Sequence, residues 1–185
     1  MANAVIHFFD SFAKKKEETM KSKEKPLKML LIAMFLFLVG GFSTCLSQIK
    51  SYNLSDIERL NQEQRRITVV FLHTDWCQYC KAMQRTTFRN KTVEALLNEN
   101  FYFVSFDAES KDEVQFAGKI LKYRPRGRGA GEHQLVDLLL GDEERVYPQM
   151  VFINSKNEEV YRLNGFVRAK ELEKTLRILV QTGNE

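Results

Sequence analysis

Four short apolar runs, rich in β-branched and aromatic side chains, are typical of strands in a buried sheet. They lie at residues 67–72, 101–107, 148–154 and 158–165. The last two runs are joined through the polar residues SKNE, a composition that favours a tight turn. We therefore predict four strands, of which the last two form a hairpin.

Other segments carry apolar residues three and four positions apart, the spacing that places them on one side of a helix. The clearest is AKELEKTLRILVQ, in which Leu172, Leu176 and Leu179 recur at this spacing. Another segment opens at Ser55 with SDIE, which has the pattern of a capping box. We predict helices over residues 56–66, 90–100, 113–121, 132–140 and 169–181.

A separate apolar run near the N-terminus shows no amphipathic period. Residues 29–39 are continuously apolar and come after a lysine-rich flank over residues 1–28. The run matches the core of a signal peptide, and the uncharged stretch 29–47 is also long enough for an uncleaved membrane anchor, which needs about 20 residues. The lysines predict a cytoplasmic N-terminus and export of residues 48–185 to the periplasmic side of a bacterial inner membrane. Lipidation of Cys45 ranks below both alternatives.

Composition and charge limit what residues 48–185 can be. They are long enough for one domain, and 44% of the whole chain is hydrophobic, so a core is feasible without a disulfide scaffold. Before residue 48, seven lysines and four acidic residues supply +3 of the net charge of +4. The predicted domain keeps only +1, which argues against nucleic acid as a partner.

One segment of the predicted domain fits no regular pattern. Residues 123–133, YRPRGRGAGEH, alternate arginine with glycine. The spacing is not that of a dinucleotide fingerprint, and no predicted strand leads into it. We expect a flexible insertion whose arginines are free to contact an acidic partner.

Two of the three cysteines, Cys77 and Cys80, lie in HTDWCQYCKAMQ, directly after the first predicted strand. A closed zinc site needs four ligands, and beyond this pair the chain offers only Cys45 and three scattered histidines. A two-cysteine copper(I) site stays open, because soft thiolates suit that metal. A purely structural disulfide across so short a loop would remove little chain entropy and would stabilise the fold poorly.

A redox role explains the surroundings of the pair better. We predict that Cys77 opens a helix, on which residues three apart lie on the same side, so that its sulfur can reach Cys80. The free amides and the dipole at a helix N-terminus favour the thiolate form of Cys77. Cys80 lies one turn further in and is expected to be the shielded, resolving thiol.

The stretch TDWCQYCK after the strand ITVVFL resembles the W-C-x-x-C-K active site of the thioredoxin superfamily. The resemblance covers most of residues 55–182 and extends to VYPQMVFIN, where Pro148 matches a cis-proline that faces the cysteines in that family. Tyr147 matches the residue before this proline, and Gly165 matches a glycine of the family's peptide-binding groove. The resemblance implies a thioredoxin-like α/β fold, with a central mixed sheet flanked by helices.

Three departures separate the chain from thioredoxin itself. Phe71 stands where thioredoxin has a buried aspartate that helps to move the proton of the second cysteine. Gln78 and Tyr79 replace the Gly-Pro between the cysteines, and the segment 108–146 is longer. In these respects the chain is similar to the exported thioredoxin-like proteins of bacteria.

The resemblance implies thiol–disulfide exchange outside the cytoplasmic membrane, in which Cys77 forms a mixed disulfide and Cys80 resolves it. No bound cofactor or metal is implied. The expected partners are exported proteins with thiols or disulfides, together with a membrane redox donor or acceptor. Trp76 is expected to pack beside the site, and His73 is a candidate proton carrier. The alternative is a binding module of the same fold that delivers copper(I) or holds client proteins without turnover.

Overall fold

The computed structural model describes residues 48–127 and 129–182. The basic flank predicted over residues 1–28, the signal or anchor segment predicted over 29–47 and Cys45 lie outside the described residues. Within the described part, no helix is long and apolar enough to cross a membrane.

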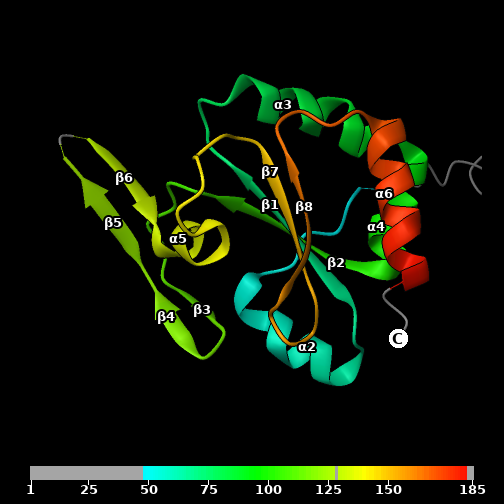
Figure 1. Cartoon of the computed structure of the whole chain (residues 1–185), viewed down its shortest axis with the longest axis horizontal. Coiled ribbons are helices and arrows are strands. Elements are labelled where there is room, and N and C mark those ends of the chain that lie inside the picture. The colour runs from blue at the N-terminus through cyan, green and yellow to red at the C-terminus, as the bar shows by residue number, and fades with distance from the viewer. Residues whose placement is uncertain (1–47, 128, 183–185) are drawn as a thin grey trace, which may run out of the picture. The chain divides into compact units, whose positions relative to one another are not determined.

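A mixed four-stranded sheet forms the centre of the domain, in the order β2–β1–β7–β8 (Figure 1). β1 runs parallel to β2 and antiparallel to β7, which in turn pairs antiparallel with β8. All of β7 and the five middle residues of β1 are buried, because both faces of these strands are covered. The four predicted strands are confirmed as β1 (Ile67–His73), β2 (Phe101–Asp107), β7 (Gln149–Ile153) and β8 (Glu159–Asn164).

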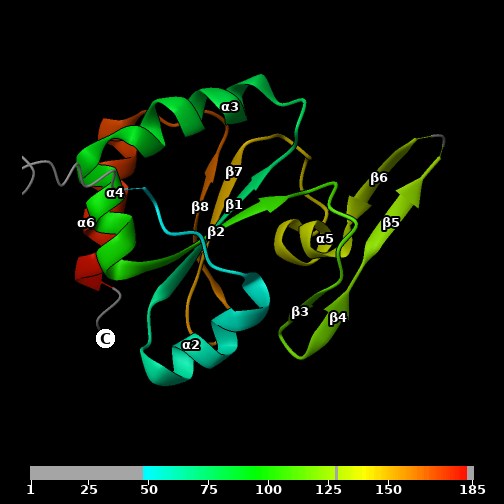
Figure 2. The ribbon, with the colours of Figure 1, turned by 180° about the vertical axis from the view of Figure 1, so that it is seen from behind.

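Helices cover both faces of this sheet, and each face has its own core. Val69 and Phe71 of β1 belong to a cluster with residues of α3, α4 and α6, whereas Val70 and Leu72 belong to a cluster with residues of α2 and α5. Figures 1 and 2 show these two layers from opposite sides. The helices are α2 (Ile57–Glu63), α3 (Gln78–Arg85), α4 (Lys91–Asn100), α5 (Gln134–Leu140) and α6 (Ala169–Thr182), with single 3-10 turns η1 (Leu54–Asp56) and η2 (Thr87–Arg89).

Of the five helices predicted by residue range, four are confirmed to within a few residues, as α2, α4, α5 and α6. The predicted capping box at Ser55 is wrong. The chain enters α2 through η1, and the cap of η1 is Asn53, whose side chain accepts a hydrogen bond from the backbone N–H of Ser55 at 2.9 Å. Asn53 supplies the acceptor because the first turn begins two residues earlier than the capping-box pattern places it.

The helix predicted over residues 113–121 is wrong, because this segment is a β-hairpin. Val114 and Phe116 are buried while the residue between them is exposed, which is the two-residue period of a strand. The chain reverses at Ala117 and Gly118, both with positive φ, as in the tight turns that join paired strands. The strands are β3 (Val114–Phe116) and β4 (Lys119–Leu121).

The prediction of a flexible insertion over residues 123–133 is also wrong, because most of this segment forms a second hairpin. It pairs β5 (Tyr123–Arg126) with β6 (Ala130–His133) and extends away from the central sheet in both views (Figures 1 and 2). A Cβ atom at Gly131 would collide with the side chain of Tyr123, so glycine is what allows the two strands to approach here.

His133 links this hairpin to α5. Its side chain is fully buried, and its Nδ1 accepts a hydrogen bond from the backbone N–H of Leu135 at 3.1 Å, which caps the helix. Its Nε2 lies 3.0 Å from the carbonyl oxygen of Asp112, so this nitrogen carries the proton and donates. Burial lowers the pKa of His133 below its ordinary value of 6.5, although the backbone contact at Asp112 opposes this shift.

We predict that the domain loses stability as the pH falls through the histidine range. A folded-state pKa below 6.5 means that unfolding takes up a proton, so this stabilisation is complete above 6.5 and is lost at lower pH. The free energy of unfolding should therefore decrease from about pH 7.5 to about pH 5.5, the range in which histidine titrates. In His133→Asn, which keeps a helix-capping oxygen, denaturant unfolding should show a shallower decrease. His73, whose pKa is also lowered, accounts for a remaining slope. Equal slopes in the two proteins would contradict this role of His133.

Candidate active site

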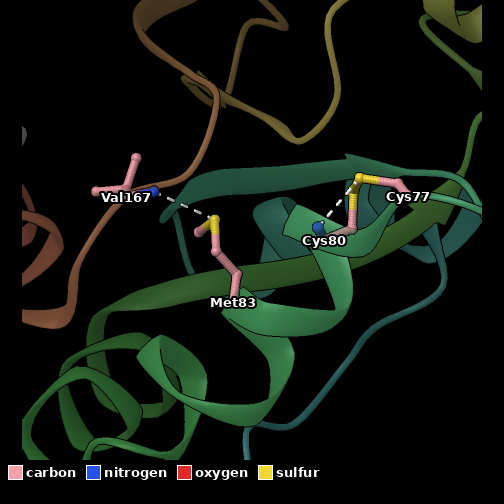
Figure 3. The surroundings of a disulfide bond; sticks show 4 residues. All are labelled: Cys77, Cys80, Met83 and Val167. Atoms are coloured by element: carbon pink, nitrogen blue, oxygen red, sulfur yellow. Dashed lines mark hydrogen bonds between the residues drawn. A yellow bond between two sulfur atoms is a disulfide. The ribbon is translucent and has the colours of Figure 1, made fainter.

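The two cysteines lie where strand β1 gives way to helix α3. Cys77 is the N-cap of α3, and its backbone N–H donates to the carbonyl oxygen of Thr74 at 3.2 Å. Its sulfur accepts a hydrogen bond from the backbone N–H of Cys80 at 3.1 Å, and the two sulfurs form a disulfide with the Cα atoms 5.3 Å apart (Figure 3). The helix N-terminus thus directs an amide donor at the sulfur of Cys77, as the sequence predicted.

The pair is held in an apolar environment. Cys77 is 4% exposed and Cys80 is 1% exposed, and both belong to the core cluster between the sheet and α3, α4 and α6. Met83, one turn after Cys80, accepts a hydrogen bond through its sulfur from the backbone N–H of Val167 at 3.5 Å (Figure 3). The carbonyl oxygen of Val167 in turn accepts from the hydroxyl of Thr87 at 2.7 Å. These two contacts fasten the loop after β8 to α3, the helix that follows Cys77, and to the turn η2 next to it.

The structure places the matched proline beside the end of β1. Gln149 of β7 lies opposite Leu72 of β1, so Pro148 lies just before β7 and next to the strand end that leads to the cysteines. The Tyr147–Pro148 peptide bond is cis. The carbonyl oxygen of Pro148 accepts from the backbone N–H of Gly165 at 2.8 Å, and Gly165 has φ of +77°, a conformation that favours glycine.

Two aromatic side chains flank this region. Trp76 is 62% exposed, and its ring meets that of Tyr147 edge to face with 6.4 Å between centroids. The indole N–H of Trp76 donates to Glu109 at 3.0 Å, and the hydroxyl of Tyr147 donates to Glu132 at 2.7 Å. Tyr147 also packs against the cluster that contains both cysteines. Burial, and then the contact with Glu132, raises the pKa of Tyr147, so the phenol stays protonated at neutral pH.

A family model described as a thioredoxin-like domain matches residues 55–179, well over half of the chain. The chain belongs to the thioredoxin-like family. This confirms the family on which the sequence interpretation rested, together with its mixed sheet and flanking helices. No match was found among curated proteins.

Solved structures show the same fold. A thioredoxin from Thermus thermophilus aligns with a TM-score of 0.54 and 23% identity, over 75% of this chain and 92% of that chain. A protein titled DsbH oxidoreductase aligns with a TM-score of 0.51 and 15% identity, over 73% and 86% of the two chains. A candidate disulphide isomerase from Bacteroides thetaiotaomicron aligns with a TM-score of 0.50 and 25% identity, over 75% and 98%.

His73 was predicted as a candidate proton carrier from its position before the cysteines in this thioredoxin-like domain. It ends β1, and its ring lies 5.4 Å from that of Phe71 between centroids. Burial lowers its pKa, and the charges of Asp107 and Asp75 oppose the shift. In the described part of the chain no hydrogen bond joins its ring to either cysteine, so its role as a proton carrier stays a prediction.

Phe71 is the residue that the sequence interpretation matches to the buried aspartate of thioredoxin. It is fully buried in the cluster that contains the cysteines, where its ring packs edge to face on Phe88 at 4.8 Å between centroids. Strand β1 therefore brings an aromatic ring, and no carboxylate, to the inner side of the pair. Over residues 48–127 and 129–182, no group of three or more histidine, cysteine, aspartate or glutamate residues is placed to hold a metal ion.

Sequence reasoning missed Glu109 and Glu132. Both carboxylates accept hydrogen bonds from the aromatic residues that flank the cysteines, yet each lies far from its partner in the sequence. No local motif could have identified them, because the contacts exist only once the segment after β2 folds back beside the site.

We predict that, in the reduced protein, iodoacetamide modifies Cys77 before Cys80. The sulfur of Cys77 lies at the first turn of α3 with an amide donor directed at it, whereas Cys80 is 1% exposed. Mass spectrometry of peptides after brief labelling measures the order, with Cys45 assigned separately from its own peptide. Faster labelling of Cys80 would show that the attacking and resolving thiols are assigned the wrong way round.

Proposed function

We propose that this protein is a thiol–disulfide oxidoreductase that uses Cys77 and Cys80 as its redox pair. The observation that carries the proposal is the disulfide at the N-terminus of α3 in a thioredoxin-like domain, with the Cys80 amide directed at the sulfur of Cys77. Two structural neighbours, the DsbH oxidoreductase and the candidate disulphide isomerase, carry names that support the same chemistry.

The reduced pair transfers two electrons to a substrate disulfide. The Cys77 thiolate attacks one substrate sulfur, which forms a mixed disulfide and releases the other substrate sulfur as a thiolate. Cys80 then loses its proton and attacks the sulfur of Cys77, which forms the Cys77–Cys80 disulfide and releases the second substrate thiolate. The substrate has gained two electrons and the pair has lost them. The reverse sequence oxidises a dithiol substrate.

The direction depends on the reduction potential of the pair. Pairs in this fold range from about −270 mV to about −120 mV, according to how strongly the protein stabilises the reduced form. The amide donated to Cys77 favours a thiolate there and so favours the reduced form, whereas the apolar surroundings disfavour it. Equilibration of the protein with glutathione measures the reduction potential that results from these two opposing effects.

The proposed location is the exported side of a bacterial inner membrane. The lysine-rich flank before the apolar residues 29–39 supports a cytoplasmic N-terminus and an exported domain. The proposed partners are exported proteins with thiols or disulfides, and a membrane redox donor or acceptor that resets the pair. Such a partner is needed because each turnover leaves Cys77 and Cys80 in the opposite redox state.

We predict that the two cysteine variants fail differently. Cys77→Ser should lose all exchange with insulin, because the attacking sulfur is gone. Cys80→Ser should accumulate a mixed disulfide with its substrate, because no thiol remains to resolve it. Non-reducing electrophoresis and mass spectrometry distinguish the two results, and Cys45→Ser is the matched control that should retain exchange.

Two results would contradict this proposal. Identical behaviour of the two variants would remove the assigned roles. A wild-type protein that binds copper(I) tightly through the pair and exchanges no disulfide would instead favour the metal-delivery alternative.

We predict that alkaline phosphatase fused after Glu185 is active in bacterial cells, because this enzyme folds only on the exported side. A green fluorescent protein at the same position should stay dark after export through the general secretory route. Cells with a bright fluorescent fusion and an inactive phosphatase fusion would reverse the proposed topology.

A further inference from the structure

Glu132 is a carboxylate of the insertion that reaches the redox site. It belongs to β6, and its side chain is 11% exposed. One carboxylate oxygen accepts from the hydroxyl of Tyr147 at 2.7 Å, and the other accepts from Nε of Arg145 at 3.2 Å. Both partners belong to the short segment that leads into the cis-proline, Pro148. A single side chain of the hairpin therefore holds this segment at two points.

A network of charges fixes Glu132 in turn. We expected the arginines of this segment to be free for an acidic partner. Instead, Arg124 and Arg126 of β5 contact acidic residues of the chain itself. Both bind Asp137 of α5, and Arg126 also lies 3.5 Å from Glu132. Arg145 joins the network through a 2.8 Å contact with Asp137. The hairpin is thus tied to α5 and to the segment before Pro148 by the same group of side chains.

The chain of contacts continues from Tyr147 to the cysteines. Its ring meets that of Trp76, the residue before Cys77, and packs against the cluster that contains the disulfide. Trp76 is fixed at its other end by Glu109. The two aromatic rings are therefore held from outside by two carboxylates, both supplied by the segment that follows β2.

A purely packing role for Tyr147 would not need its hydroxyl. Burying a phenol and a carboxylate has a desolvation cost that a phenylalanine at this position would avoid. The hydrogen bond between them fixes direction, because it allows the ring only one orientation toward Glu132. Burial and Glu132 together keep the hydroxyl protonated, so the donor is present at any physiological pH.

We propose that Glu132 is a positioning residue for protein substrates. Glu132 holds Tyr147, and Tyr147 in turn holds the Trp76 ring and the backbone before Pro148. An extended segment of the substrate binds to this arrangement. This inference rests on the proposed exchange function. The insertion then takes part in recognising protein disulfides. A small disulfide does not depend on the insertion, because it needs only access to Cys77.

Kinetics with two substrates test the role of Glu132 in recognition. In Glu132→Ala, kcat/KM for a protein disulfide such as insulin should fall about tenfold, mainly through KM, which is the effect of one lost charge-assisted hydrogen bond. Exchange with a small aromatic disulfide should change less than about twofold, since no extended segment binds. Tyr147→Phe removes the same hydrogen bond without opening a cavity and should give the same result. Glu132→Gln keeps an acceptor oxygen and should recover most of the loss.

Trp76 gives a second readout that needs no turnover, because it is the only tryptophan of the chain. The fluorescence emission of Trp76 in the reduced, folded protein should change in Glu132→Ala and in Tyr147→Phe. The double variant should show no further change, because each single substitution removes the same hydrogen bond. Glu113→Gln is the matched control: it removes the charge of an exposed carboxylate of the same insertion that pairs with Lys122, outside the network around Glu132, and Trp76 emission should stay at the wild-type value.

The outcomes separate this inference from the proposed function. A wild-type protein without exchange activity would overturn the proposed function, while the fluorescence of the variants would still decide whether Glu132 positions the aromatic pair. Unchanged emission in Glu132→Ala and Tyr147→Phe, or an equal change in Glu113→Gln, would overturn the positioning role. Equal losses with protein and small disulfides would overturn the role in recognition.

Discussion

The junction between strand β1 and helix α3 fixes where the reactive sulfurs lie. Five consecutive buried residues hold β1 in the centre of the sheet, so the point at which the chain leaves the sheet has little freedom. Cys77 ends the turn that follows and caps α3, which brings the amide of Cys80 to its sulfur. The disulfide, the directed amide and the shielding of Cys80 all follow from this one connection.

Two other segments reach the junction because of strand pairing. The register of β7 on β1 sets Pro148 beside the end of β1, and the pairing of β8 with β7 returns the chain to Gly165. The loop after Gly165 is then fastened to α3 and η2 through Val167. Residues from three distant parts of the chain therefore surround the pair without any direct covalent constraint between them.

The insertion between β2 and β7 adds a polar layer to this otherwise apolar site. Glu109 and Glu132 bind the outer ends of Trp76 and Tyr147, and arginines of the hairpin and the following segment neutralise Glu132. Exposed ion pairs contribute little to stability, but a shielded carboxylate with several donors fixes the geometry of its neighbours. The network therefore matters more for the orientation of the aromatic rings than for the stability of the fold.

The sequence by itself determined the features that depend on local pattern. Strands β1, β2, β7 and β8, the helices α2, α4, α5 and α6, and the position of Cys77 at a helix start were predicted from local composition, apolar spacing and short motifs. These predictions succeed because a continuous apolar run or a helical period is decided by neighbours within about one or two turns of chain. The family was predicted from the WCxxCK motif together with the strand before it and the later strand that opens at Pro148, and the family model confirms it.

The tertiary structure alone decided the insertion and its contacts. Residues 113–121 have a composition compatible with a helix, and only the burial of Val114 and Phe116 beneath the sheet selects strands. Residues 123–133 contain no apolar alternation, and their pairing becomes stable where Tyr123 packs over Gly131 and the arginines meet Asp137. The hydrogen bond from Tyr147 to Glu132 joins two residues that no periodic pattern in the sequence relates to each other. Such contacts depend on distances between packed elements, and those distances exist only after the chain has folded.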